Sequence, residues 1–234
     1  MTIFRFALLR STRNPLTLIC TYLMPIALIL IRPLWAGGNV GFFADGGFAL
    51  LAMLTMSSAY LMSLNILADK TDGAVIRILA APITMRRYLT ENLLSCAVPL
   101  FVQMGLVSIL GMVLYDWSVT LSFAVFLCYT ILTLASVAMA FAWHCLFKSK
   151  ADSGAGFSLV LFLTAFIGGV TFPVTVFPGL LEYVGVIFPV YWAMRGLRAV
   201  LETGVMNNQF WIGVAVMSLF TVAFLLYGGK RRIV

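Results

Sequence analysis

Long stretches without a charged side chain alternate with short basic segments along the whole chain. Each long stretch reaches the roughly 18–20 residues that cross about 30 Å of hydrocarbon as an α-helix. Helices are expected because backbone polar groups in lipid must be satisfied within the membrane segment. The pattern therefore predicts an all-α, polytopic membrane protein with six spans, in the stretches Asn14–Ile31, Gly46–Ala68, Asn92–Tyr115, Trp117–Phe147, Ser153–Leu181 and Thr203–Gly229.

Two further apolar segments are too short to span. Residues 1–15 alternate Phe and Leu with Arg5, Arg10 and Arg13. This alternation predicts an amphipathic N-terminal helix in the headgroup layer, and a frayed basic tail is the alternative. The stretch Tyr183–Met194 predicts a re-entrant or interfacial segment between the fifth and sixth spans.

Composition and charge exclude an ordinary soluble domain and set the orientation. Hydrophobic residues make up 62% of the chain and charged residues only 10%. With the N-terminus in the cytoplasm, twelve of the fifteen basic residues lie on the inner side, and Arg32, Arg195 and Arg198 lie outside. This bias predicts that both termini are cytoplasmic in a cell membrane. The net charge of +7 then indicates contact with anionic membrane lipid and not with nucleic acid.

Candidate chemistry within the chain is sparse. No acidic or basic residue lies in the middle of a predicted span, which disfavours ion-coupled transport. Asn65 and Gln103 are polar residues within spans, and we expect them to make interhelical hydrogen bonds. His144 and the scattered cysteines lack metal-ligand spacing, and no G-x-x-x-x-G-K-[ST] motif occurs. We therefore expect no catalytic, cofactor or metal site here, and any energy source would be a separate subunit.

The segment 69–91, between the second and third spans, has a helical pattern of its own. Thr71 or Asp72 can cap a helix over Ala74–Ala81, and Pro82 ends it. Thr84 can cap the next helix. Val75, Ile76, Leu79 and Ala80 share one side of the short helix, with Arg77 turned aside. Such an apolar face must be buried away from water, either against the membrane surface or against a partner protein.

Three stretches in this order resemble the membrane subunits of type-2 ABC exporters: "LLRSTRNPLTLICTYLMPIALIL", "DKTDGAVIRILAAP" and "GGVTFPVTVFPGLLEYVGVIFPVYWAMRGLRAVL". The resemblance implies that the segment 69–91 holds a coupling helix that docks on a cytosolic ATPase. It implies docking residues at Asp69, Asp72, Gly73, Ile78, Leu79 and Pro82. Ile76, on the apolar side of the same helix, is a further candidate docking residue. It leaves open which acidic residue touches the ATPase, because Thr71 and Ala74 stand where the family often has an acidic residue and Thr.

The resemblance also implies re-entrant outer helices over residues 178–202 that cap the outer mouth of a translocation pathway. The corresponding outer gate residues are Phe172, Pro173, Pro178, Pro189 and Arg195. Prolines break helices into pieces too short to span. An ordinary surface loop, anchored by Tyr191 and Trp192 at the headgroups, is the alternative. Whether Arg195 or Arg198 meets a substrate or a lipid phosphate stays open.

The function implied is that of a membrane subunit of an ATP-driven exporter for a hydrophobic or amphipathic substrate, such as a drug, a lipid or a peptide. It would pair with a second permease copy or a paralogue. Two ATPase subunits would bind ATP and Mg²⁺ and hydrolyse the nucleotide, so the chain itself is not expected to be an enzyme. A non-transporting assembly or scaffold protein that binds a cytosolic partner is the first alternative. An ion-independent channel or facilitator, which would conduct without any nucleotide, is the second.

Overall fold

The computed structural model describes residues 2–35, 47–80, 84–147, 149–167 and 184–230. All regular secondary structure in these ranges is helical, which confirms the predicted all-α class. The elements are α1 (Thr2–Arg13), α2 (Pro15–Leu18), the π-helix η1 (Ile19–Leu23), α3 (Met24–Trp35), α4 (Gly47–Thr71), α5 (Ala74–Leu79), α6 (Met85–Tyr115), α7 (Val119–His144), α8 (Lys150–Ile167), α10 (Pro189–Thr203) and α11 (Asn208–Lys230).

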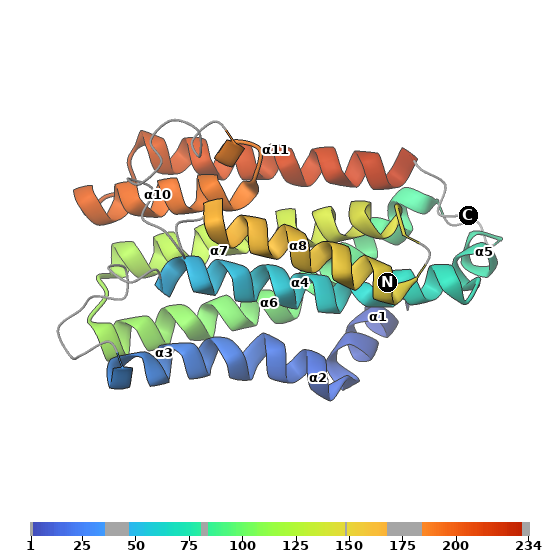
Figure 1. The fold of residues 1–234 in the computed structure, drawn as a ribbon, viewed down its shortest axis with the longest axis horizontal. Helices are drawn as coiled ribbons and strands as arrows, with labels where there is room; N and C mark the ends of the chain where they lie inside the picture. Colours follow the sequence, from blue (N-terminus) through green and yellow to red (C-terminus); the bar gives the residue numbers. More distant parts are fainter. Residues whose placement is uncertain (1, 36–46, 81–83, 148, 168–183, 231–234) are drawn as a thin grey trace.

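Helix α7 lies at the centre of the bundle and packs on α4, α6, α10 and α11 (Figure 1). Its C-terminal half contains five small residues that are all buried: Ala135, Ser136, Ala138, Ala140 and Ala142. Small side chains let neighbouring backbones approach closely where lipid supplies no hydrophobic driving force. The small-residue stretch therefore explains why α7 takes the central position.

Four helices are each long and apolar enough to cross a membrane: α4, most of α6, α7 and most of α11. A fifth candidate is the bent pair formed by Ile3–Arg13 and Pro15–Ile31. Helix α8 covers the first part of the predicted fifth span, whose remainder falls outside the described residues. Four to five spans are therefore supported, and six remains a prediction. Large apolar side chains such as Phe162 and Leu219 are exposed on α8 and α11, as a lipid-facing surface requires.

The chain bends by 82° between α1 and the helical run that starts at Pro15. Proline disfavours the helical conformation in the preceding residue, and Asn14 is extended, with φ −81° and ψ 114°. The Asn14 Oδ1 accepts a hydrogen bond from the Leu16 backbone N–H and caps the second helix. The predicted N-terminal helix thus forms as a separate element, set at an angle to the first long helix.

Helices α5 and α10 lie at opposite ends of the bundle (Figure 1). We call these the α5 end and the α10 end. Helix α10 has 15 residues and packs along α11. A Cβ added at Gly213 of α11 would lie 2.8 Å from the Trp192 carbonyl oxygen, so glycine permits this close approach.

Candidate coupling site at the α5 end

The short helix predicted between the second and third spans is present. Helix α4 ends at Thr71, and Asp72 and Gly73 form a turn in which Gly73 has φ +68°. This left-handed conformation suits glycine, which has no Cβ. Helix α5 then follows and ends at Leu79, two residues before the predicted end. The Thr84 hydroxyl accepts a hydrogen bond from the Arg87 backbone N–H, which confirms the predicted cap of α6.

One side of α5 is already covered by the chain itself. Val75 is buried with Tyr88 and Leu89 of α6, and Ile78 packs on the same cluster. The sequence pattern placed Val75 on an exposed apolar face, and this prediction is wrong because the ends of α4 and α6 enclose the side chain. The side chains of Ile76 and Leu79, and all of Pro82, lie outside the described residues.

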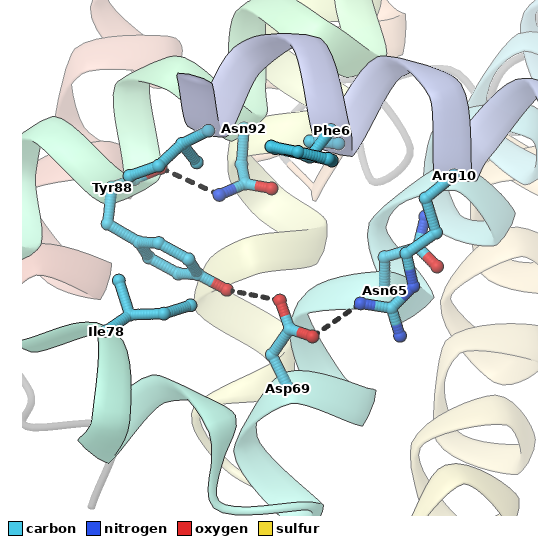
Figure 2. Close-up of a pocket in the computed structure, with 9 residues that line it drawn as sticks. Phe6, Arg10, Asn65, Asp69, Ile78, Tyr88 and Asn92 are labelled. Atoms are coloured by element: carbon cyan, nitrogen blue, oxygen red, sulfur yellow. Dashed lines mark hydrogen bonds and ion pairs between the residues drawn. The ribbon is translucent and has the colours of Figure 1, made fainter. Parts of the chain in front are cut away.

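Asp69, in the last turn of α4, binds two other helices (Figure 2). Its Oδ1 forms an ion pair with the Arg10 guanidinium of α1, and its Oδ2 accepts a hydrogen bond of 2.8 Å from the Tyr88 hydroxyl of α6. The Asp69 side chain is 16% exposed, whereas Asp72 lies at the surface. Of the two acidic residues predicted to dock a partner, Asp69 thus has both carboxylate oxygens engaged inside the chain.

A cavity of about 390 Å³ surrounds this cluster, between α1, α4, α5 and α6. Such a volume falls within the range of small-molecule sites. We call it the coupling cavity, and it is lined by Ile3, Phe6, Ala7, Arg10, Asn65, Asp69, Ile78, Tyr88 and Asn92. Figure 2 shows Phe6 and Arg10 on α1 above the cavity and Ile78 of α5 on the opposite side. The N-terminal helix and α5 therefore share a single cavity at the α5 end.

Lys70, the next residue of α4, caps the end of α7. Its ammonium group donates to the carbonyl oxygens of His144, Cys145 and Phe147 at 3.2, 3.3 and 3.1 Å. The last carbonyls of a helix lack intrahelical partners and carry partial negative charge, so a cation there satisfies both needs. The final turn of α4 is thus joined to α1 and α6 through Asp69 and to α7 through Lys70.

A buried polar circuit at His144 joins α4, α7 and α8. The Tyr60 hydroxyl donates to the Ser153 Oγ, which lies 3.1 Å from the His144 Nδ1. The His144 Nε2 lies 2.8 Å from the Ser63 Oγ, whose hydrogen is donated to the Tyr60 carbonyl. Because each hydroxyl has one hydrogen, this pattern assigns the imidazole proton to Nε2. His144 is therefore a structural residue, a role that sequence reasoning did not find.

The two polar residues predicted within spans behave differently. Asn65 lines the coupling cavity. Gln103 is buried in α6, and neither its Oε1 nor its Nε2 has a hydrogen-bond partner among the described residues. The interhelical hydrogen bond expected of Gln103 is therefore not formed within the described part of the chain.

At the α10 end, the structure describes two of the five predicted gate residues. Pro189 occupies the first turn of α10, where its missing N–H costs nothing. Arg195 is exposed, and its guanidinium lies 5.7 Å from the centre of the Trp192 ring, within cation–π distance. Phe172, Pro173 and Pro178 lie outside the described residues.

The sequence matches the model of one known protein family. A family model for the ABC-2 family transporter proteins matches residues 37–229, which cover most of the chain. No curated protein matches the sequence. Within the described residues, no group of three or more His, Cys, Asp or Glu side chains is placed to hold a metal ion.

Proposed function

The chain belongs to the ABC-2 family of transporter proteins, and from this membership we propose that it is the membrane subunit of an ATP-driven exporter. It is a multi-pass membrane permease by family and by its long apolar helices. The proposal adds that a separate cytosolic ATPase supplies the energy through α5.

The observation that supports this proposal is the connection of α5 to the rest of the bundle through the last turn of α4. Helix α5 is a short, non-spanning helix that follows α4 after the Asp72–Gly73 turn. The last turn of α4, which precedes it, contacts three other helices through Asp69 and Lys70. A push on α5 would therefore displace α4 together with α1, α6 and α7 as a rigid group, a common form of conformational coupling.

The proposal places the α5 end in the cytoplasm. Among the described residues, most of the basic ones fall in the segments at that end, as the positive-inside rule requires. The proposal keeps six spans, with α8 as the described part of the fifth. Two ATPase subunits bind below, each holding ATP and Mg²⁺, and a second permease copy or a paralogue completes the pathway.

The docking surface proposed for the ATPase is the outward side of α5 with the turn before it. Asp72 and Gly73 contribute at the turn, and Ile76, Leu79 and Pro82 contribute apolar contacts. Asp72 is the favoured acidic contact because both oxygens of Asp69 are used within the chain. At the other end, residues 178–202, with Pro189 and Arg195, form the proposed outer gate for a hydrophobic or amphipathic substrate.

Copurification from the native membrane tests the docking, with ATP hydrolysis as the readout. The tagged full chain should retain an ATPase, and Ile76→Asp with Leu79→Asp should release it, because two carboxylates would enter an apolar interface. The matched control is Val205→Asp, an exposed apolar position at the α10 end. If the ATPase stays bound to the Ile76/Leu79 variant, the docking assignment is wrong.

Reconstitution in lipid vesicles separates export from the scaffold alternative. An exporter complex should hydrolyse ATP faster when a transported amphiphile is present and should move that amphiphile across the bilayer. A complex that binds the ATPase but shows neither effect with any amphiphile tested would favour a non-transporting assembly protein. Movement by the purified chain without nucleotide would favour a channel.

A further inference from the structure

We propose that a second cavity, next to the coupling cavity, binds the phosphate headgroup of an anionic phospholipid. The lipid-binding part of this inference requires only that the chain lies in a membrane, and it does not require export. The effect of the bound lipid on coupling rests on the proposed function. We call this cavity the headgroup cavity.

The headgroup cavity has a volume of about 200 Å³ and lies at the joint between α1 and α2, against α4 and the start of α8. Its walls come from four elements and from the bend at Asn14. They are formed by Arg10, Asn14, Leu16, Thr17, Leu61, Leu64, Asn65, Ala68 and Lys150. Two of these residues are basic and none is acidic, so the cavity presents positive charge.

The two cations are available to an anion. Arg10 is 46% exposed and uses one guanidinium nitrogen for Asp69 in the coupling cavity. A guanidinium has five N–H donors, so others remain for a phosphate. Lys150 is exposed, and it forms no ion pair with a carboxylate of the described residues. Two cations that line one cavity repel each other, and a bound phosphate would relieve this repulsion.

Amide donors complete the polar part of the cavity. The Asn14 Oδ1 is occupied by the Leu16 N–H, which leaves the Asn14 amide N–H groups as donors. Asn65 supplies a second side-chain amide. The phosphodiester of a phospholipid has only acceptor oxygens at neutral pH, so cations and amide donors are the groups that suit it.

Position and size favour a lipid over a soluble phosphate ester. The cavity lies where α4 and the run from Pro15 approach the α5 end, at the level of the proposed headgroup layer. Basic pockets between membrane helices on the cytoplasmic side commonly bind anionic headgroups. Leu16 is 58% exposed and offers an apolar edge for the start of an acyl chain. The volume is below the 300–1,000 Å³ typical of pockets that enclose a whole ligand, so only the headgroup would be enclosed.

Arg10 connects lipid binding to coupling. It lines both cavities and pairs with Asp69 in the last turn of α4, just before α5. A phosphate on the other side of its guanidinium would hold Arg10 in the position that binds Asp69. The lipid would therefore stiffen the contact between α1 and α4, and ATP hydrolysis should be coupled more tightly to transport in anionic membranes.

The test is lipid retention by the purified full chain, measured by native mass spectrometry. The two probes are phosphatidylglycerol and phosphatidylcholine with the same acyl chains. The chain should retain phosphatidylglycerol in preference. Lys150→Gln should weaken that retention about fivefold, since one Lys near an anionic surface contributes about 1 kcal/mol. Lys150→Arg should preserve it.

The matched control is Arg77→Gln, which removes one positive charge at the same end but does not line the cavity. Equal retention by Lys150→Gln and Arg77→Gln would overturn the site, as would equal retention of both lipids by the unchanged protein. Displacement of phosphatidylglycerol by millimolar glycerol phosphate would overturn the lipid in favour of a soluble phosphate ester. The assay contains no ATPase and no nucleotide, so its result is independent of the proposed export function.

Discussion

Asp69 and Lys70 are neighbours in α4, yet their side chains fasten this helix to different parts of the bundle. Asp69 binds Arg10 of α1 and Tyr88 of α6, and Lys70 binds three carbonyl oxygens at the end of α7. The turn into α5 begins two residues later. The last turn of α4 is therefore the junction at which movement of α5 would reach three other helices.

The first prediction concerns Asp69→Asn. The change removes the negative charge that binds Arg10, while an amide oxygen remains for Tyr88. Because Arg10 is 46% exposed, solvent screens the ion pair, and we expect the free energy of unfolding to fall by only about 0.5–1 kcal/mol. The larger effect should be local: the amides of α1 should exchange with deuterium faster, because α1 loses a contact to α4.

Asp72→Asn is the control for this experiment. Asp72 is exposed and forms no ion pair with a described residue, so α1 should exchange at its original rate. Arg10→Gln combined with Asp69→Asn should cost less than the sum of the two single changes, as expected for partners in contact. Additive effects would show that Arg10 and Asp69 do not interact in the membrane.

The second prediction concerns Lys70→Met. The long apolar side chain keeps much of the volume but cannot donate to the carbonyl oxygens of His144, Cys145 and Phe147. We expect the free energy of unfolding in micelles to fall by about 1–2 kcal/mol, the cost of leaving a helix end without its cap. Lys150→Met removes the same group at an exposed position and should change stability by less than about 0.5 kcal/mol. Similar losses in the two variants would contradict the capping role.

Local signals in the sequence predicted the fold well where they act over a few residues. Thr84 caps α6 as predicted, because a cap depends on the next turn of helix alone. The α5 helix was predicted from its apolar spacing, and it forms. Its Val75 was assigned to the wrong environment, because spacing identifies a face of a helix and not the neighbour that covers it.

Most contacts of the candidate site could not be predicted from the sequence, because they join residues that are far apart in the chain. Arg10 and Asp69 are 59 residues apart, and Ser63 and His144 are 81 residues apart. No local pattern pairs such residues, and Arg10 alone indicated only a membrane surface. The single His near the end of an apolar span was a signal that could have suggested a buried circuit, because a polar ring at that depth needs partners.

The third prediction concerns His144→Ala. The change breaks the hydrogen bonds to Ser63 and Ser153 and leaves a cavity between α4, α7 and α8. We expect a loss of about 2–3 kcal/mol in the free energy of unfolding. Ser158→Ala on α8 is the control, because Ser158 is exposed and bonds only the Gly154 carbonyl of its own helix; it should change stability by less than about 0.5 kcal/mol. A His144→Ala protein as stable as this control would contradict the buried circuit.

The fourth prediction compares two glycine-to-alanine changes in membrane helices. At Gly213 the new methyl group would lie 2.8 Å from the Trp192 carbonyl oxygen, so α10 and α11 must separate. At Gly105 nothing lies within 4 Å of the new group. We expect Gly213→Ala to lower the free energy of unfolding by about 1–3 kcal/mol through overpacking, and Gly105→Ala to be neutral or to raise it by up to about 1 kcal/mol. If the proposed gate includes α10, Gly213→Ala should also reduce transport while the ATPase stays bound, because the damage lies at the end opposite α5. Equal stability of the two variants would mean that α10 does not pack closely on α11, and the outer gate would then lose its structural support.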